Sequence, residues 1–131
     1  MIAWLLIAAV LTRLPAIDLA TVRQLHETKI KPASEVVFNL GRNAPKSDAE
    51  WIAVSRAGIT LTESGKLLML APRASADKKW TALSRQLTAA GRTATRAARA
   101  RNLSALMRAS DRLVTVCETC HAPYRNQTGK L

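Results

Sequence analysis

The sequence predicts an all-α protein, and more specifically an antiparallel four-helix bundle. Of its residues 48% are apolar but only 4% are aromatic, and the abundance of Ala, Leu, Arg and Thr favours helix over strand. Four amphipathic segments joined by short loops are the pattern of such a bundle. A chain of 131 residues can form one domain with its own core. We therefore expect residues 21–131 to form the bundle, after a separate N-terminal segment of residues 1–20.

The N-terminal segment begins with an apolar run, residues 1–11. The run has the length of a signal-peptide core and is too short to span a bilayer comfortably. This pattern predicts an exported protein. No basic residue precedes the run, and residues 16–20 make a poor cleavage site, so both a cleaved signal peptide and a short membrane anchor stay open.

The first helix is expected between residues 21 and 40. Its apolar side chains recur at near-helical spacing, and they are Val22, Leu25, Val36 and Leu40. Pro32 lies in the middle of this segment, and a proline lacks a backbone N–H and clashes with the preceding turn. The helix should therefore be kinked or interrupted before Pro32.

The second helix should begin after Ser47, because Ser47 and Glu50 have the spacing of a capping box. Its apolar or small positions recur at intervals of three and four, and Pro72 should stop it. These positions are Trp51, Val54, Gly58, Leu61, Gly65 and Leu68.

The third helix repeats this spacing, and the fourth follows Asn102, a residue suited to cap it. The third helix carries Trp80, Leu83, Leu87, Ala90, Ala94 and Ala97 on one face, and the fourth carries Leu103, Leu106, Ser110, Leu113, Cys117 and Cys120. Small residues in the second and third helices permit a close approach between helices, which means either plain packing or room for a flat macrocycle. Pro123 is expected to end the fourth helix.

The chain is strongly basic, with 20 Lys and Arg against nine Asp and Glu and a formal charge of +11. Such a charge implies an anionic partner. Nucleic acid is not expected, because no recognition helix and no interleaving of aromatic and basic residues is present. An acidic redox protein or an anionic membrane surface would use the same field. The arginines of the third helix, Arg85, Arg92, Arg96 and Arg99, are interpreted as a solvated face.

The residues that carry chemistry form the string Cys117-Glu118-Thr119-Cys120-His121, the pattern of covalent haem attachment. On a helix, Cys117, Cys120 and His121 share one face. Two thiols can then add to the two haem vinyl groups while the imidazole reaches the iron from the same side. The sequence thus predicts one haem c, bound through Cys117 and Cys120 with His121 as an iron ligand, on the C-terminal helix. This chemistry is completed on the oxidising side of the membrane, which agrees with a periplasmic location.

Three other interpretations of the cysteines are weaker. A thioredoxin-like Cys-x-x-Cys needs a sheet, and none is predicted. A closed zinc site needs four ligands, but His26 and carboxylates are the only further candidates. A disulfide between residues three apart on a helix has poor geometry.

The sequence also resembles a known family, the class II cytochromes c or cytochrome c prime group. The resemblance covers roughly residues 21–125 and rests first on the attachment string near the C-terminus, which continues through Tyr124 and Arg125. Further similar strings, found in small exported bacterial cytochromes, are Lys31-Pro32-Ala33-Ser34, Ser47-Asp48-Ala49-Glu50-Trp51 and Glu63-Ser64-Gly65-Lys66-Leu67-Leu68-Met69.

This resemblance implies a four-helix bundle with haem on its last helix and His121 as the fifth iron ligand. It also implies that the cationic Arg125 lies close to the haem edge and that Tyr124 packs beside the macrocycle. Many members of the group dimerise, so a homodimer is an open alternative.

Members of this group differ in the sixth iron ligand, and here His26 lies in the corresponding region. His26 and His121 are the only two histidines, and a neutral imidazole binds iron well, so two axial histidines are one hypothesis. The alternative is a surface His26 or one bonded to a haem propionate. Met69 and Met107 are interpreted as core residues, and Lys29 as an unsuitable ligand.

The number of iron ligands decides the function. Two strong axial ligands suit single-electron transfer, with a potential lower than that of a Met/His pair. Five-coordinate iron would instead bind nitric oxide or carbon monoxide. A peroxidase would need a distal acid–base group, for which only His26 is available. We expect an electron carrier that is not an enzyme.

Overall fold

The structure of this protein is a computed structural model that describes residues 21–70, 73 and 77–124. Within them it has helices and no strand. The helices are α2 (Val22–Leu25), a π-helical segment (His26–Ile30), α3 (Lys31–Phe38), a 3-10 segment (Asn39–Gly41), α4 (Asp48–Leu68), α5 (Lys78–Arg99) and α6 (Leu103–Tyr124).

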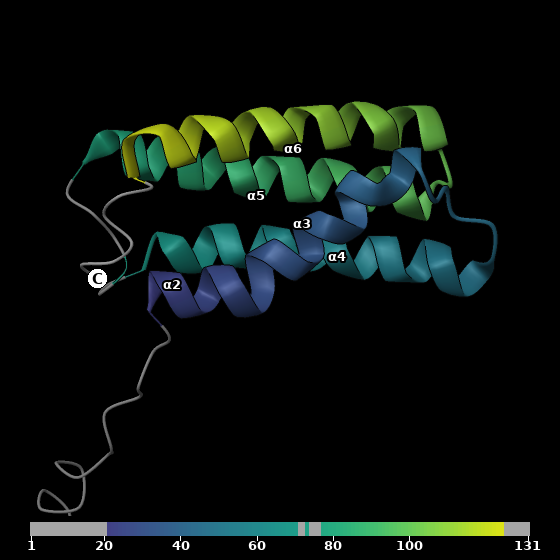
Figure 1. Cartoon of the computed structure of the whole chain (residues 1–131), viewed down its shortest axis with the longest axis horizontal. Helices are drawn as coiled ribbons and strands as arrows, with labels where there is room; N and C mark the ends of the chain where they lie inside the picture. The colour runs from purple at the N-terminus through teal and green to yellow at the C-terminus, as the bar shows by residue number, and fades with distance from the viewer. Residues whose placement is uncertain (1–20, 71–72, 74–76, 125–131) are drawn as a thin grey trace, which may run out of the picture.

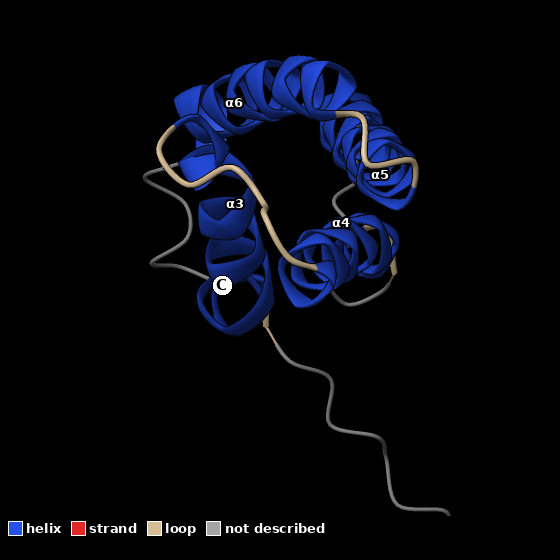
Figure 2. Cartoon of the chain, turned by 90° about the vertical axis from the view of Figure 1, so that its right-hand side faces the viewer, coloured by secondary structure: helices blue, strands red, loops and turns tan. Residues whose placement is uncertain are grey.

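Four helical rods pack around one core, as expected for a helical bundle. The segments from α2 to the 3-10 turn form the first rod, and α4, α5 and α6 form the others (Figure 1). Successive rods alternate in direction, and the view along the bundle shows them around a common interior (Figure 2). The largest fully buried side chains in this interior include Val37, Leu61, Leu106 and Leu113. The predicted fold class is therefore confirmed at the level of an all-α bundle.

The predicted caps are present, and they explain where two of the helices begin. The Ser47 hydroxyl accepts the Glu50 N–H, and the Glu50 carboxylate accepts the Ser47 N–H at 2.8 Å. The backbone N–H groups of Lys46 and Ser47, which both donate to the Glu50 carboxylate, hold the pKa of Glu50 below its usual value. The side-chain oxygen of Asn102 accepts the Ala105 N–H at 3.0 Å at the start of α6. Local sequence thus fixes both starts without help from the rest of the fold.

Pro32 distorts the first rod but does not interrupt it. The expected break takes the form of a π-helical turn over His26–Ile30, directly before Pro32. The axis of α3 turns away from that of α2 at this point (Figure 1). As a consequence, the prediction that Val36 belongs to the apolar face is wrong. Val36 is 39% exposed, and its neighbour Val37 is fully buried instead.

The ends of α4 and α6 differ from the predicted ones. Helix α4 already ends at Leu68, and Pro72 lies outside the described residues. Helix α6 runs past Pro123 to Tyr124, so Pro123 does not end it. A proline in the last turn removes only one backbone hydrogen bond, which a helix end tolerates more easily than a helix centre does.

The small residues of α4 and α5 serve plain packing. A Cβ built on Gly58, Gly65 or Gly91 would lie less than 3.0 Å from backbone atoms of the facing helix. None of these glycines lines the pocket described below, so they leave no room for a macrocycle. None of the helices in the described part of the chain is long and apolar enough to cross a membrane.

Candidate cofactor site

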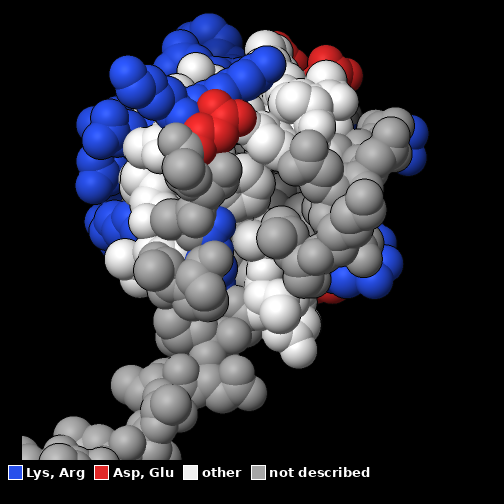
Figure 3. Space-filling model, turned by 90° about the vertical axis from the view of Figure 1, so that its left-hand side faces the viewer, with Lys and Arg blue, Asp and Glu red and all other residues white. Residues whose placement is uncertain are grey.

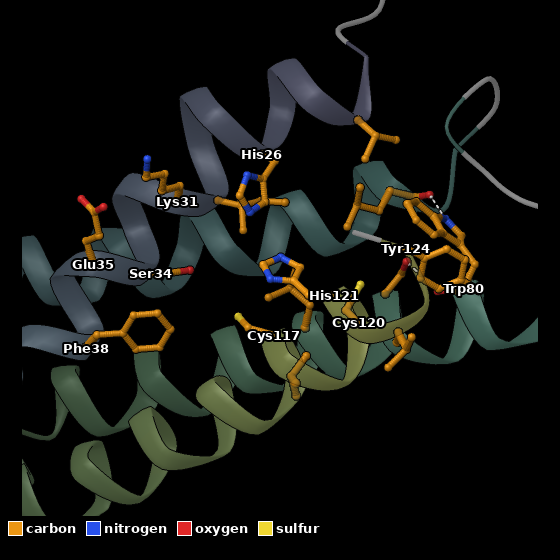
Figure 4. Close-up of a pocket in the computed structure, with 17 residues that line it drawn as sticks. His26, Lys31, Ser34, Glu35, Phe38, Trp80, Cys117, Cys120, His121 and Tyr124 are labelled. Carbon is orange, nitrogen blue, oxygen red and sulfur yellow. Dashed lines mark hydrogen bonds between the residues drawn. The ribbon is translucent and has the colours of Figure 1, made fainter. Parts of the chain in front are cut away.

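A pocket of about 300 Å³ lies between the first rod, α5 and α6. Its walls are mostly apolar, and they include Ile30, Phe38, Leu83, Leu87 and Val116. Cys117, Cys120, His121 and Tyr124 reach it from α6, and His26 reaches it from the π-helical turn (Figure 4). Five of the six residues proposed as a haem site therefore meet in one place. The sixth, Arg125, lies outside the described residues.

The two thiols lie on the pocket side of α6 and are half-buried, with no disulfide between them. Burial, with smaller contributions from Cys120 and Glu118, raises the pKa of the Cys117 thiol to about 11. Burial also raises the pKa of the Cys120 thiol. Both thiols are therefore protonated near neutral pH. A reactive thiolate of the thioredoxin kind needs the opposite shift.

The two histidines face each other across the pocket. Their ring centroids are 5.5 Å apart, and the ring planes are inclined by 60°. An ion bound by two opposed imidazoles would hold the centroids about 6 Å apart, because metal–nitrogen bonds to histidine are about 2 Å long. The separation of the two centroids in the structure, 5.5 Å, is slightly shorter than this value. The His26 side chain is 34% exposed, and its Nδ1 lies 3.5 Å from Oε1 of Glu27, so this ring has room to adjust.

One end of the pocket is closed by an aromatic pair. Trp80 and Tyr124 pack edge to face with centroids 5.2 Å apart. The Trp80 indole N–H donates to the Leu68 carbonyl at 2.8 Å, and the Tyr124 hydroxyl donates to the Asp77 carboxylate. Asp77 also caps α5 by accepting the Lys79 N–H at 2.9 Å. Tyr124 thus links the end of α6 to the start of α5, beside the predicted attachment residues.

The Tyr124–Asp77 hydrogen bond predicts a measurable titration. It raises the pKa of Tyr124 to about 12, with burial contributing less, and it lowers the pKa of Asp77. Tyr124 is the only tyrosine, so its phenolate absorbance can be followed alone. We expect a midpoint near pH 12 and a lower midpoint in Asp77→Asn, whose side chain carries no charge to hold the proton.

The same shifts set the direction of the effect on stability. The pKa of Tyr124 is higher in the folded than in the unfolded protein. The contribution of Tyr124 to the stability of the fold is therefore complete below the unfolded pKa, and it is lost as the pH rises through about 12. The folded pKa of Asp77 is lowered, so its contribution is present above the unfolded pKa and is lost in acid. Equal Tyr124 midpoints in the wild type and in Asp77→Asn would contradict this account.

Ser34 is a pocket residue that the sequence did not single out. It lies on α3 and is buried, and its oxygen has no hydrogen-bond partner. Figure 4 shows its side chain directed toward the pocket, whereas Lys31 and Glu35 point away. On the opposite wall, the Ser84 hydroxyl donates to the Trp80 carbonyl at 2.8 Å. An unpaired buried hydroxyl costs about 1–3 kcal/mol, so Ser34 offers a donor to whatever occupies the pocket.

The other ligand candidates do not line the pocket. Met69 and Met107 are half-buried, with Met107 packed against the core, and Lys29 is exposed. In the described part of the chain, no group of three or more His, Cys, Asp or Glu side chains is arranged to hold a bare metal ion. A structural zinc site therefore gains no support from the geometry.

The basic residues of α5 lie away from the pocket. Arg85, Arg92, Arg96 and Arg99 are exposed, which agrees with a solvated helix face. A second hollow between α4 and α5, of about 260 Å³, is bordered by three of these arginines and by Glu63, whose carboxylate pairs with Lys66 at 2.9 Å. Lys and Arg also surround much of the face at which α2 begins and α6 ends, where Asp and Glu are few (Figure 3).

Comparison with known proteins adds no relative to this picture: no protein-family model, curated protein or solved structure matches the chain.

Proposed function

We propose that this chain is a monohaem c-type cytochrome that carries single electrons outside the cytoplasm. One observation carries the proposal. Cys117, Cys120 and His121 open from one face of α6 into an apolar pocket, and His26 faces His121 at 5.5 Å between ring centroids. A haem needs this donor set: two thiols on one helix, an adjacent imidazole and an apolar enclosure.

The residues present fit a haem in two further respects. The pocket volume of about 300 Å³ lies at the lower end of the range for small-molecule sites, about 300–1,000 Å³. The unpaired Ser34 hydroxyl offers a donor to a polar group on the occupant. When bound, haem would supply a one-electron iron couple.

Each residue has a proposed part in this function. Cys117 and Cys120 tether the cofactor to α6, and His121 binds the iron. His26 completes the coordination from the π-helical turn. Tyr124 holds the end of α6 in place through Asp77 and packs against Trp80 at the pocket end. Arg125 is proposed to lie near the haem edge on the basis of the family resemblance alone.

The partners and location follow from charge and chemistry. An acidic redox protein fits the formal charge of +11, which would accelerate encounter with it. Covalent haem attachment implies an exported, periplasmic protein. The proposal leaves open whether residues 1–20 are a cleaved signal peptide or a membrane anchor, and whether the protein forms a homodimer.

Changing His26 to Ala tests the proposed coordination. We expect the ferric wild-type protein to be low-spin and the variant to be high-spin, because the variant loses one of two strong axial ligands. Absorption and electron paramagnetic resonance spectra measure this directly. Lys29→Ala, one turn away and exposed, is the matched control and should keep the low-spin spectrum. A high-spin wild type that His26→Ala leaves unchanged would show an open iron site.

The unpaired Ser34 hydroxyl also favours a second candidate function. A donor without a partner beside the pocket is what a site for a small polar iron ligand would offer. The alternative is therefore a five-coordinate protein that binds nitric oxide or carbon monoxide. Rapid carbon monoxide binding by the ferrous wild type would favour it, whereas binding only in His26→Ala favours the electron carrier.

A further inference from the structure

One row of side chains on the first rod faces the pocket at regular intervals of four residues. These are Val22, His26, Ile30, Ser34 and Phe38. In a regular α-helix four residues rotate by about 400°, so each step moves the side chain about 40° around the axis. Over the whole row this adds to about 160°, which would turn one end of the row away from the pocket.

The π-helical turn reduces this drift to about 60°, because one residue of the row adds no further rotation. The Lys31 N–H donates to the His26 carbonyl, five residues earlier, whereas an α-helix joins residues four apart. A turn of this kind holds one extra residue, so the chain before it stays in line with the chain after it. His26 therefore shares the pocket-facing row with Ser34 and Phe38.

The core gives independent support for the extra residue. Leu25 and Val37, which are 12 positions apart, are both buried, whereas Val36 is 39% exposed. In a regular helix the residue in line with Leu25 would be the eleventh, Val36, because 11 residues complete about three turns. The apolar face is thus displaced by one residue across the π-helical turn.

Pro32 accounts for the place of this turn. It has no N–H to offer, and its ring would clash with the Thr28 carbonyl four residues earlier in a regular α-helix. Thr28 itself is exposed, and its hydroxyl donates only to the Gln24 carbonyl, at 2.7 Å. Its side chain therefore makes no contribution to the pocket.

We propose that this π-helical turn is the positioning element for iron coordination, because it absorbs one extra residue and so keeps His26 at the helical phase that faces His121. This inference rests on the proposed haem function. It assigns the coordination of the iron to the helical phase of His26 relative to Ser34 and Phe38, and gives the side chain of Thr28 no part in it.

Two variants that each change the length by one residue test the proposal. Deleting Thr28 in a Pro32→Ala background, where no proline ring opposes a regular helix, turns the π-helical turn into an ordinary α-helical one and leaves His26 in phase, so the ferric protein should stay low-spin. Inserting one alanine after Thr28 rotates His26 by about 100°, so the protein should become high-spin. Both are measured on the purified, haem-loaded chain by electron paramagnetic resonance, with far-UV circular dichroism to compare helix content.

The outcomes separate this inference from the proposed function. A high-spin deletion variant, or a low-spin insertion variant, overturns the inference and leaves the haem function in place. A wild type without covalent haem, or with high-spin iron, overturns the proposed coordination and the inference with it. If the insertion variant does not fold, the deletion decides alone, because a deletion within a regular α-helix would rotate His26 off the iron.

Discussion

Changing both Cys117 and Cys120 to alanine is expected to abolish covalent haem attachment completely. The two thioether bonds are the only covalent links that the site offers, since these are the only cysteines in the chain. Haem held by His121 and apolar contacts alone dissociates when the protein is denatured. The measurement is haem staining of a denaturing gel, together with the intact mass of the purified protein.

The control for this experiment lies between the two cysteines. Thr119 is exposed, and its hydroxyl donates to the Thr115 carbonyl at 2.7 Å, so Thr119→Ala leaves both thiols and the pocket as they are. It should retain haem at the wild-type level. Haem that survives denaturation in the double cysteine variant would falsify the proposed attachment, whatever the spectrum of the folded protein.

The sequence was sufficient for the helices whose ends are fixed locally. Ser47 and Glu50 cap α4 as their spacing predicts, and Asn102 caps the start of α6. Both signals lie within four residues of chain, so tertiary packing has no opportunity to override them. Asp77 also caps α5, but no capping box accompanies it, so the sequence around it carries a weaker signal for the start of that helix.

The first rod shows what periodicity cannot provide. Pro32 marks the place of a distortion, but a kink, a break and a π-helical turn all agree with a proline at that position. These three distortions differ in how far the residues before the proline are rotated about the helix axis relative to those after it. Regular helical spacing therefore predicts Val36 on the apolar face, where the structure has Val37. Packing against the other three rods decides between a kink, a break and a π-helical turn. The sequence of the first rod alone carries no information about that packing.

The candidate site also contains residues that local sequence predicts and residues that only packing brings together. The attachment residues could be found from the sequence because chemistry demands a fixed local spacing of thiols and imidazole. Their closeness to His26, which is 95 positions earlier in the chain, depends on how the first rod packs beside α6. Counting on from His26 in steps of four residues leads to Ser34 and Phe38. In a regular helix, however, side chains at this spacing turn progressively away from the pocket, so the sequence alone does not place these two residues there.

Changing Gly91 to Ala is expected to destabilise the bundle strongly, although alanine is the better helix former. A Cβ at this position would lie 2.5 Å from the backbone nitrogen of Thr62 and 2.8 Å from the Gly58 carbonyl oxygen. Because both atoms belong to backbone, no change of rotamer relieves the clash, and α4 and α5 must move apart. Because both contacts are with rigid backbone, the cost should lie at the upper end of the usual range for overpacking, about 3 kcal/mol, whereas the gain in helix propensity is about 1 kcal/mol.

We therefore expect a net loss of about 2 kcal/mol in the free energy of unfolding and a fall in Tm on the order of 10 °C. Thermal and urea unfolding followed by circular dichroism measure both. Gly41→Ala is the matched control: a Cβ there would meet only Cε of Met107, at 3.7 Å, so its unfolding free energy should change by no more than about 0.5 kcal/mol. If the two variants lose equal stability, the separation of α4 and α5 is not set by Gly91.

Gly91 does not line the pocket, so the folded fraction of Gly91→Ala should keep the spin state of the wild type. This result would separate the packing of α4 against α5 from the coordination of the iron.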